Sequence, residues 1–296
     1  MSLPVSRRSF LSLATTGVAV SALGLAPAAE AARKRAAAPA TPGVAAAAGT
    51  VYLNLNEHPL GPAPAAIEAA TRSLARSGRY LLEMEQDLRN LMTGELQLPN
   101  EHLSLFPGSR DALNRAGSLL TSARAGLVVD EAYIHYSNEP SVADLVRQRQ
   151  DLIVLRSFSK LYGMAGLRLG AALAPPGLQT KLAAFGSNPL SVPAMAAGIA
   201  SLRDPVLVQT RRAENARVRE ETIAWLKGKG YTCLPSQANC FLLDVKRDAS
   251  VFADSMQKQG VIVYRSWPIW PKRVRVSVGT EAEMLRFREA FGKAKR

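Results

Sequence analysis

Short apolar runs alternate with longer stretches of helical spacing along most of the chain. Four runs of four or five mostly apolar residues end at polar residues or turn formers, a pattern typical of buried strands. Between them, apolar residues recur three and four positions apart, which predicts amphipathic helices. The predicted strands are residues 103–106, 126–129, 152–156 and 169–173. Strands and helices in this order indicate an α/β core.

The last sixty residues follow a different pattern. Strands are predicted at 240–245, 261–264 and 273–278, with helices at 250–259 and 281–293. This alternation predicts a smaller α+β domain after the α/β core. The predicted organisation is a signal peptide at 1–31, an Ala/Pro-rich linker at 32–50, an N-terminal arm at 51–75, a large domain at 76–188 and a small domain at 189–296.

The N-terminus resembles a twin-arginine export signal. The pair Arg7-Arg8 is followed by a mildly apolar run, residues 11–26, and then by small residues that offer A-x-A cleavage sites. The run is short for a permanent transmembrane helix, so we expect only transient contact with the membrane. The predicted location of the exported protein is periplasmic or otherwise extracytoplasmic. A general secretory signal or an ordinary basic N-terminus, which would leave the protein cytoplasmic, are the alternatives.

Charge and composition exclude several classes of site. The chain has 37 Lys and Arg against 24 Asp and Glu, a net charge of +13, and five basic residues against one acidic residue precede Gly49. The other basic residues are dispersed without interleaved aromatics, so nucleic-acid binding is unsupported. Two cysteines cannot form a disulfide framework, and three scattered histidines have no metal-ligand spacing. We therefore expect no metal.

The segment 157–170 has the richest chemistry. It combines Ser157, Ser159, Lys160 and Arg168 with several glycines directly after a predicted strand. Ligands bind at the carboxyl ends of strands in open α/β sheets, and this set suits an anionic ligand. Desolvation beside Arg168 would lower the pKa of Lys160 and leave a neutral amine that can attack an aldehyde. The alternative is a solvated loop lysine.

Several motifs, in the family's order, resemble the fold-type I pyridoxal-phosphate-dependent aminotransferases, most closely the histidinol-phosphate aminotransferase group. The resemblance implies an α/β fold with a truncated large domain and a smaller C-terminal α+β domain. The matching segments are the arm at 54–62, the glycine turn at 107–110, D-E-A-Y at 130–133, the lysine motif at 157–170, and the small-domain motifs at 235–239 and 275–280.

The same resemblance implies a role for each site residue. Lys160 would carry pyridoxal 5'-phosphate and move a proton at the substrate α-carbon, Asp130 would pair with the pyridinium nitrogen, and Tyr133 would contact the phenolic oxygen. Asn56 and Arg275 would bind the substrate, Arg275 through its α-carboxylate. The residues implied at the cofactor phosphate are Gly108, Ser109, Arg110, Ser157, Ser159 and Arg168, with Tyr80 reaching the phosphate in a neighbouring subunit.

Three of these assignments have plain alternatives. Asp130 could be a solvated turn residue, Arg275 a surface arginine on a strand, and Tyr80 a packing tyrosine. Tyr80 lacks the Pro-Asp that usually follows it in the family, since Leu81-Leu82 stand there. If Tyr80 does serve a second subunit, the protein is a homodimer with shared sites.

The chain differs from the family between the glycine turn and D-E-A-Y. Only 22 positions separate Gly108 from Asp130. The family has a much longer segment there, which includes the aromatic residue that stacks on the cofactor ring and an Asn-Pro loop. The resemblance therefore implies an internal deletion, with its junction near residues 120–124.

The predicted function is that of a pyridoxal-phosphate-dependent aminotransferase. It would move an amino group from an L-amino acid to an oxo acid or a related carbonyl compound. The alternatives are a catalytically impaired remnant that still binds the cofactor, and a pyridoxal-phosphate-dependent decarboxylase. The sequence leaves the identity of the amino acid open.

Overall fold

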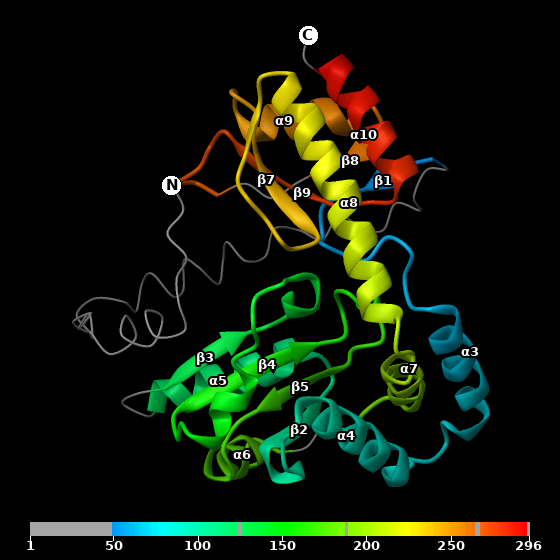
Figure 1. Ribbon diagram of the computed structural model, residues 1–296, viewed down its shortest axis with the longest axis vertical. Coiled ribbons are helices and arrows are strands. Elements are labelled where there is room, and N and C mark those ends of the chain that lie inside the picture. Colours follow the sequence, from blue (N-terminus) through cyan, green and yellow to red (C-terminus); the bar gives the residue numbers. More distant parts are fainter. Residues whose placement is uncertain (1–48, 123–125, 187–188, 264–266, 295–296) are drawn as a thin grey trace. The chain divides into compact units, whose positions relative to one another are not determined.

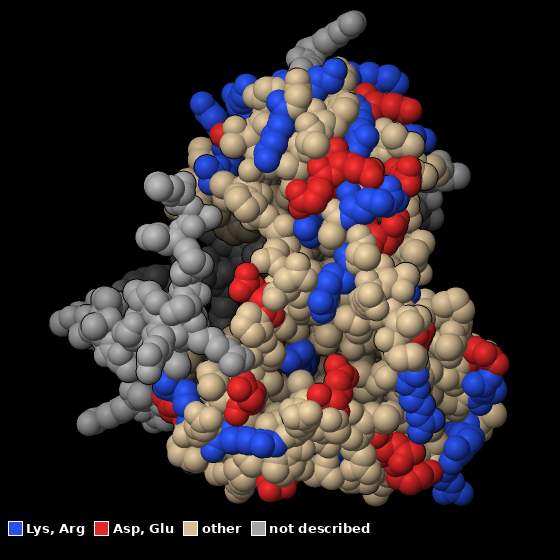
Figure 2. All heavy atoms as spheres, viewed as in Figure 1, with Lys and Arg blue, Asp and Glu red and all other residues tan. Residues whose placement is uncertain are grey.

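The computed structural model describes residues 49–122, 126–186, 189–263 and 267–294. The predicted signal peptide, most of the linker and part of the predicted deletion junction lie outside these residues. Gly49–Arg296 forms one compact unit. Among the described helices, none combines the length and apolar character that spanning a membrane requires. Basic and acidic side chains are interspersed over the face shown in Figure 2.

A four-stranded sheet lies at the centre of the first core (Figure 1). Its strands are β2 (Leu103–Phe106), β3 (Leu127–Asp130), β4 (Leu152–Ser157) and β5 (Gly170–Leu173). Their order is β2-β5-β4-β3, with β3 parallel to β4 and the other two pairs antiparallel. All four strands lie within one residue of the predicted ranges. Among the described strands, β3 pairs with β4 alone, so β3 is an edge strand.

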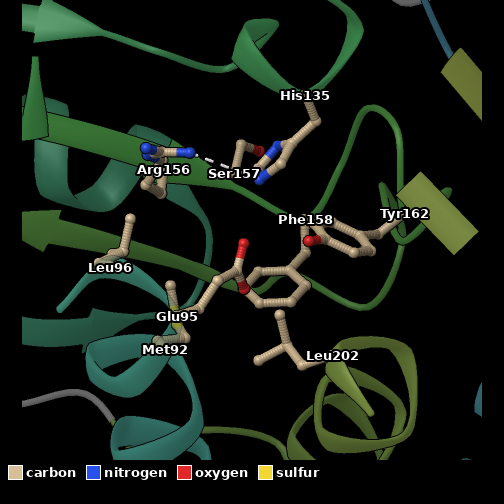
Figure 3. A pocket seen from close by; sticks show the side chains of 9 residues that line it. All are labelled: Met92, Glu95, Leu96, His135, Arg156, Ser157, Phe158, Tyr162 and Leu202. Atoms are coloured by element: carbon tan, nitrogen blue, oxygen red, sulfur yellow. Dashed lines mark hydrogen bonds between the residues drawn. The ribbon is translucent and has the colours of Figure 1, made fainter. Parts of the chain in front are cut away.

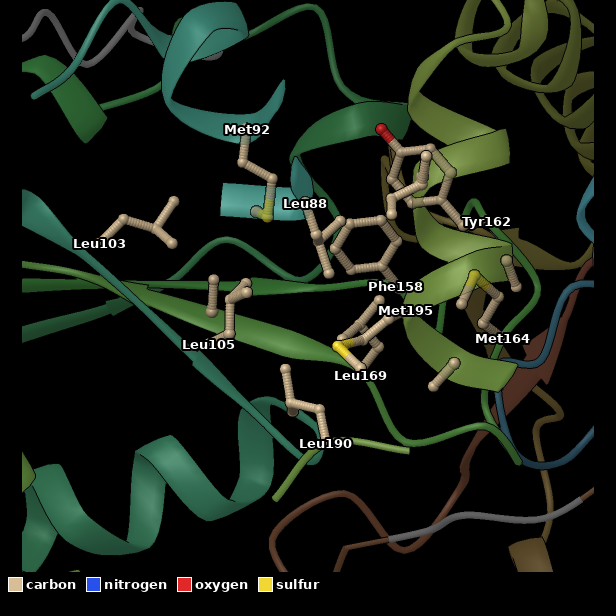
Figure 4. Packing of buried hydrophobic residues seen from close by; sticks show 14 of the residues in the cluster. Leu88, Met92, Leu103, Leu105, Phe158, Tyr162, Met164, Leu169, Leu190 and Met195 are labelled. Atoms are coloured by element: carbon tan, nitrogen blue, oxygen red, sulfur yellow. The ribbon is translucent and has the colours of Figure 1, made fainter. Parts of the chain in front are cut away.

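Alternate residues of β4 face two different layers of helices because side chains alternate across a strand. Leu152 and Val154 pack in a cluster with α3, α4 and α7, whereas Ile153 and Leu155 pack in a cluster with α5 and α6. Figure 4 shows the first cluster, in which Leu88 and Met92 of α4 lie near Phe158 and Met195. The helices are α3 (Pro64–Ser73), α4 (Leu82–Leu96), α5 (Ser109–Ser122), α6 (Pro176–Ala183) and α7 (Val192–Leu202).

The second core is built around an antiparallel sheet with the order β6-β7-β9. Phe241, Phe287 and Phe291 are its largest fully buried side chains. Its elements are β1 (Val51–Tyr52), β6 (Thr232–Cys233), β7 (Cys240–Asp244), α9 (Ala249–Gln257), β8 (Val261–Ile262), β9 (Arg273–Ser277) and α10 (Glu281–Ala294). The described residues also form short 3-10 helices at Leu74–Arg76, Asn100–His102, Ile134–Tyr136 and Ala143–Arg147.

The two cores divide at places other than the predicted domain limits. Helix α7, predicted as the start of the small domain at residue 189, packs in the first core. The long helix α8 (Leu207–Gly228) then runs from the first core, at Leu207, to the second, at Leu226. The predicted arm also starts in the second core, because β1 pairs in parallel with β8. Both differences arise from contacts between residues far apart in the chain.

Candidate functional site

Lys160 lies in the loop that follows β4. The Ser157 hydroxyl accepts a hydrogen bond from the Ser159 amide (3.1 Å), which closes a turn just before the lysine. The Lys160 Nζ donates to the main-chain oxygens of Leu55 (3.3 Å) and Asn56 (3.2 Å) on the arm. Burial first, and then the positive charge of Arg275, lower the pKa of Lys160. The cation that acts on Lys160 is thus Arg275 and not, as predicted, Arg168.

Asn56 connects the arm to both cores. Its Nδ2 donates to the Tyr133 Oη (2.9 Å) and to the Cys240 Sγ (3.1 Å). Its backbone amide donates to the Ser277 Oγ (2.8 Å), and that hydroxyl donates to the Asn56 Oδ1 (3.0 Å). The side chain is 2% exposed and its backbone has a φ of +53°. The amide of Asn56 is therefore engaged by the protein, and its predicted contact with substrate stays a prediction.

Tyr133 lies beside the lysine, with the Lys160 Nζ 5.7 Å from the centre of its ring. Burial raises the pKa of Tyr133, so its hydroxyl stays protonated at neutral pH. Asp130 is exposed at the end of the edge strand β3, where its Oδ1 accepts a hydrogen bond from the Ala132 amide (3.0 Å). Asp130 is near enough to influence the pKa of both Tyr133 and Lys160 through its charge.

Arg275 projects from β9 on the same strand face as Ser277. Its Nη2 donates to the Asn54 oxygen (2.6 Å), and its charge acts on Lys160, Tyr133 and Cys240. The structure thus brings together five residues from the arm and both cores. We call them the Lys160 cluster: Asn56, Tyr133, Lys160, Cys240 and Arg275.

An anion cradle lies next to this cluster; it consists of Gly108, Ser109, Ser159 and Arg168. Gly108 has a φ of +88°, and a Cβ atom there would run into the Arg168 guanidinium. Arg168 donates to the Ser159 Oγ (3.4 Å) and to the Ala165 oxygen (2.8 Å). Ser109 begins α5, whose unpaired amides and positive dipole end favour an anion. Because Ser159 precedes Lys160 directly, the cradle and the amine share one loop.

Two residues predicted at the phosphate lie elsewhere or face solvent. Arg110 is exposed in the first turn of α5. Tyr80 is 70% exposed and lines a different cavity of about 360 Å³ together with Arg89, Phe106 and Arg115. The predicted role of Tyr80 concerns a neighbouring subunit and stays a prediction.

A buried ion pair that sequence reasoning missed connects the ends of β3 and β4. Arg156 and Glu131 are 3.0 Å apart and both side chains are less than 9% exposed. The Arg156 Nη2 also donates to the Ser141 Oγ (2.8 Å), and the Glu131 Oε1 accepts from the Val142 amide (2.7 Å). An arginine within an otherwise apolar strand is the signal that could have revealed this pair, because a buried charge requires a partner. The pair fixes the strand ends that carry Asp130 and Ser157.

His135 lines a small interior pocket with Arg156, Glu95 and Tyr162 (Figure 3). Its ring packs edge-on against Tyr162, with the ring centres 5.0 Å apart. Burial, with Arg156 and Arg212 nearby, lowers the pKa of His135 to about 3, so the ring is neutral at pH 7. His135 lies in the interior because the 3-10 helix that carries it packs against α8.

The residues present fit pyridoxal phosphate. The cradle offers a guanidinium, hydroxyls and helix amides for a phosphate, Lys160 offers an amine with a lowered pKa for an aldehyde, and Arg275 offers a guanidinium for a carboxylate. Within the described residues no group of three or more His, Cys, Asp or Glu side chains could hold a metal ion.

Comparison with known proteins places this arrangement in a family. The family model for aminotransferase class I and II matches residues 108–291. Histidinol-phosphate aminotransferase 1 of Dechloromonas aromatica is 38% identical over 179 residues, which are 57% of this chain and 48% of that protein. The chain thus spans about half the length of that relative. The histidinol-phosphate aminotransferase of Symbiobacterium thermophilum is 28% identical, with 81% of this chain and 89% of that protein covered.

Solved structures agree on the fold. The histidinol-phosphate aminotransferase of Clostridium acetobutylicum has a TM-score of 0.73 at 15% identity and covers 83% of this chain and 99% of its own. The histidinol-phosphate aminotransferase of Sinorhizobium meliloti, solved in complex with pyridoxal-5'-phosphate, has a TM-score of 0.71 at 20% identity. The match covers 82% of this chain and 90% of that protein. The predicted fold class, that of the fold-type I enzymes, is confirmed. The chain belongs to the aminotransferase class I and II family.

Proposed function

We propose that the protein is a pyridoxal-phosphate-dependent aminotransferase that moves an amino group from an amino acid to an oxo acid. The observation that carries the proposal is Lys160, whose pKa is lowered and whose amine lies between the arm carbonyls and Tyr133, one residue after the anion cradle. The names of the similar proteins, most of them histidinol-phosphate aminotransferases, favour a substrate of that class.

Each part of the site has a role in this reaction. Bound pyridoxal phosphate supplies an aldehyde that joins amines covalently and a ring that withdraws electrons from the substrate α-carbon. The cradle holds the phosphate, with Arg168 as its cation and the α5 amides as donors. Arg275 binds the substrate α-carboxylate and so fixes the orientation of the α-carbon. The Lys160 Nζ, whose pKa is lowered, would take a proton from that carbon and return it.

The arm and Tyr133 support the lysine. Tyr133 keeps its hydroxyl proton and presents it as a donor, while Asn56 orients that hydroxyl from the arm side. The carbonyls of Leu55 and Asn56 accept from the Lys160 Nζ and limit its directions of approach. Closure of the site by the arm excludes water, which strengthens these interactions.

Product analysis tests the proposal directly. The purified protein with pyridoxal phosphate is supplied with histidinol phosphate or an aromatic amino acid as donor, and with 2-oxoglutarate as acceptor. We expect glutamate to form with kinetics of two separate half-reactions. Release of CO₂ from the aromatic amino acid without glutamate would favour the decarboxylase alternative. If neither CO₂ nor glutamate forms, the impaired remnant is favoured.

Replacement of Gly108 by alanine should weaken binding of the cofactor about tenfold. The positive φ of Gly108 costs an L-residue about 1–2 kcal/mol, and the added Cβ displaces the Arg168 guanidinium. Fluorescence titration with pyridoxal phosphate measures the change. Gly177→Ala, at a helix position with open space around it, is the matched control and should bind as the wild type does. Equal affinities of the two variants would contradict a cradle at Gly108.

The proposal includes a large domain shortened between Gly108 and Asp130. The alignment with the aromatic amino acid aminotransferase of Cutibacterium acnes is 332 positions long and covers 92% of that protein, whereas this chain has 296 residues in all. The edge position of β3 and the exposure of Asp130 also support a shortened domain.

A homodimer completes the proposal, and light scattering should give twice the mass of the chain.

Export through the twin-arginine route is the part of the proposal that rests on sequence alone. The double substitution Arg7→Lys and Arg8→Lys should leave an uncleaved precursor in the cytoplasm, because the route requires the arginine pair. Immunoblots of cell fractions from the native host measure this. A processed, exported double variant would contradict the assignment.

A further inference from the structure

A further cavity, distinct from those at Tyr80 and His135, lies apart from the Lys160 cluster. Its volume is about 270 Å³, which is close to the range for small-molecule sites. The arm just beyond Asn56, helix α8 and the turn after β9 form its walls. Its lining includes Pro59, Leu60, Val218 and Val278, and most of its surface is apolar. Neither Lys160 nor Arg275 belongs to it.

Arg211 gives this cavity a buried positive charge. It lines the cavity, is 9% exposed, and takes part in none of the ion pairs of the described residues. Its Nη1 donates to the Leu161 oxygen (2.9 Å), a neutral acceptor. Burial lowers the pKa of Arg211, and the negative charge of Asp204 offsets only part of this effect. A negatively charged ligand would give the Arg211 guanidinium an ion-pair partner within the cavity.

The acidic residues of the same lining do not fill this role. Glu214 and Glu281 both form ion pairs with Arg217, at 2.8 and 2.9 Å. All three side chains are more than 40% exposed, so these pairs lie on the outer rim. The carboxylates are engaged there by Arg217, whereas the Arg211 guanidinium is buried.

His58 adds a neutral hydrogen-bond donor. Its Nδ1 accepts from the Leu60 amide (3.3 Å), which places the ring proton on Nε2. Burial and the charge of Arg211 lower the pKa of His58 to about 4, so the ring is uncharged at pH 7. A guanidinium and an N–H donor in one apolar cavity suit a carboxylate attached to an apolar body.

We propose that this cavity is a second binding site, separate from the Lys160 cluster, for a small organic carboxylate with an apolar body. The carboxylate pairs with Arg211 and accepts from the His58 Nε2, and the apolar body packs against Leu60, Val218 and Val278. The site goes beyond the proposed aminotransferase function and needs no cofactor.

Calorimetric titration of the full 296-residue chain at pH 7 with hexanoate tests the site, with hexanamide as the uncharged match. We expect hexanoate to bind at one site and hexanamide to bind about tenfold or more weakly, because the amide loses the charge-assisted hydrogen bonds. Arg211→Gln should weaken hexanoate about tenfold or more. Arg203→Gln, at an exposed arginine just after α7, is the matched control and should leave the affinity unchanged.

Two further variants distinguish this cavity from the candidate active site and from misfolding. Thr210 is exposed at the cavity, so Thr210→Trp should block it without disturbing the core, and hexanoate binding should be lost. Arg275→Gln removes the proposed substrate carboxylate site and should leave hexanoate binding intact. Binding that survives Thr210→Trp, binding that is lost in Arg275→Gln, or no binding of hexanoate at all would overturn the proposal.

Discussion

Replacing Lys160 by alanine is expected to abolish both the visible absorbance that pyridoxal phosphate should give the protein and the proposed amino-transfer activity. The Nζ of Lys160 is the amine that the cluster presents, and its lowered pKa is the property that the chemistry requires. Loss of a positioned acid–base group alone lowers a rate by about 10²–10⁴-fold. We therefore expect a fall of at least this size in kcat, measured as glutamate formed.

Lys181→Ala is the matched control for this variant. Lys181 is an exposed lysine on α6 and contacts neither the Lys160 cluster nor the cradle among the hydrogen bonds and ring contacts of the described residues. It should leave both absorbance and rate unchanged. If the Lys160 variant kept the absorbance and the control lost it, the cofactor would be attached elsewhere.

Arg275→Lys is expected to raise KM for the amino acid strongly and to lower kcat/KM by about 10²-fold. Lysine keeps the charge but loses the planar pair of donors that holds a carboxylate at two points. Truncating such a pair in a buried site costs about 2–5 kcal/mol, of which the retained charge recovers a part. Steady-state kinetics over a range of substrate concentrations separates KM from kcat. Arg273→Lys, two residues earlier on β9 and packed against Trp270, should change neither constant.

For Arg275→Gln we expect a change in the pH dependence of activity. Arg275 is the cation that lowers the pKa of Lys160, so its removal favours the protonated amine and raises that pKa. The pH dependence of activity measures this change. The part of the profile that depends on the titration of Lys160 should move to higher pH in Arg275→Gln and stay in place in Arg275→Lys. Equal profiles for wild type and Arg275→Gln would contradict the proximity of the two residues.

Local patterns predicted the strands well because each strand is short, apolar and bounded by polar or turn-forming residues. The run 152–156 is fully buried as β4, and 103–106 is β2. Sheet order was beyond such patterns, because β2 pairs with β5 across more than sixty residues of sequence. The core that α7 joins was beyond such patterns for the same reason, since the apolar spacing of a helix does not indicate which core it packs in.

The candidate site, like the fold, has parts that local sequence patterns predict and parts that only the folded structure shows. Lys160, Tyr133 and Arg275 were identified from motifs, and the structure places them around one amine. The contacts of Asn56 with Tyr133 and Ser277 join segments 77 and 221 residues apart, so no local spacing could reveal them. The exposure of Asp130 depends on the strand neighbours of β3, which are also a property of the assembled sheet.

The most direct test of the central claim is to find where pyridoxal phosphate attaches. The wild-type protein is incubated with the cofactor, reduced with sodium borohydride, digested, and analysed by mass spectrometry. We predict a pyridoxyl group on the peptide that contains Lys160, in about one copy per chain, and its loss when Lys160 is alanine. Attachment to a different lysine, or no attachment at all, would contradict the account.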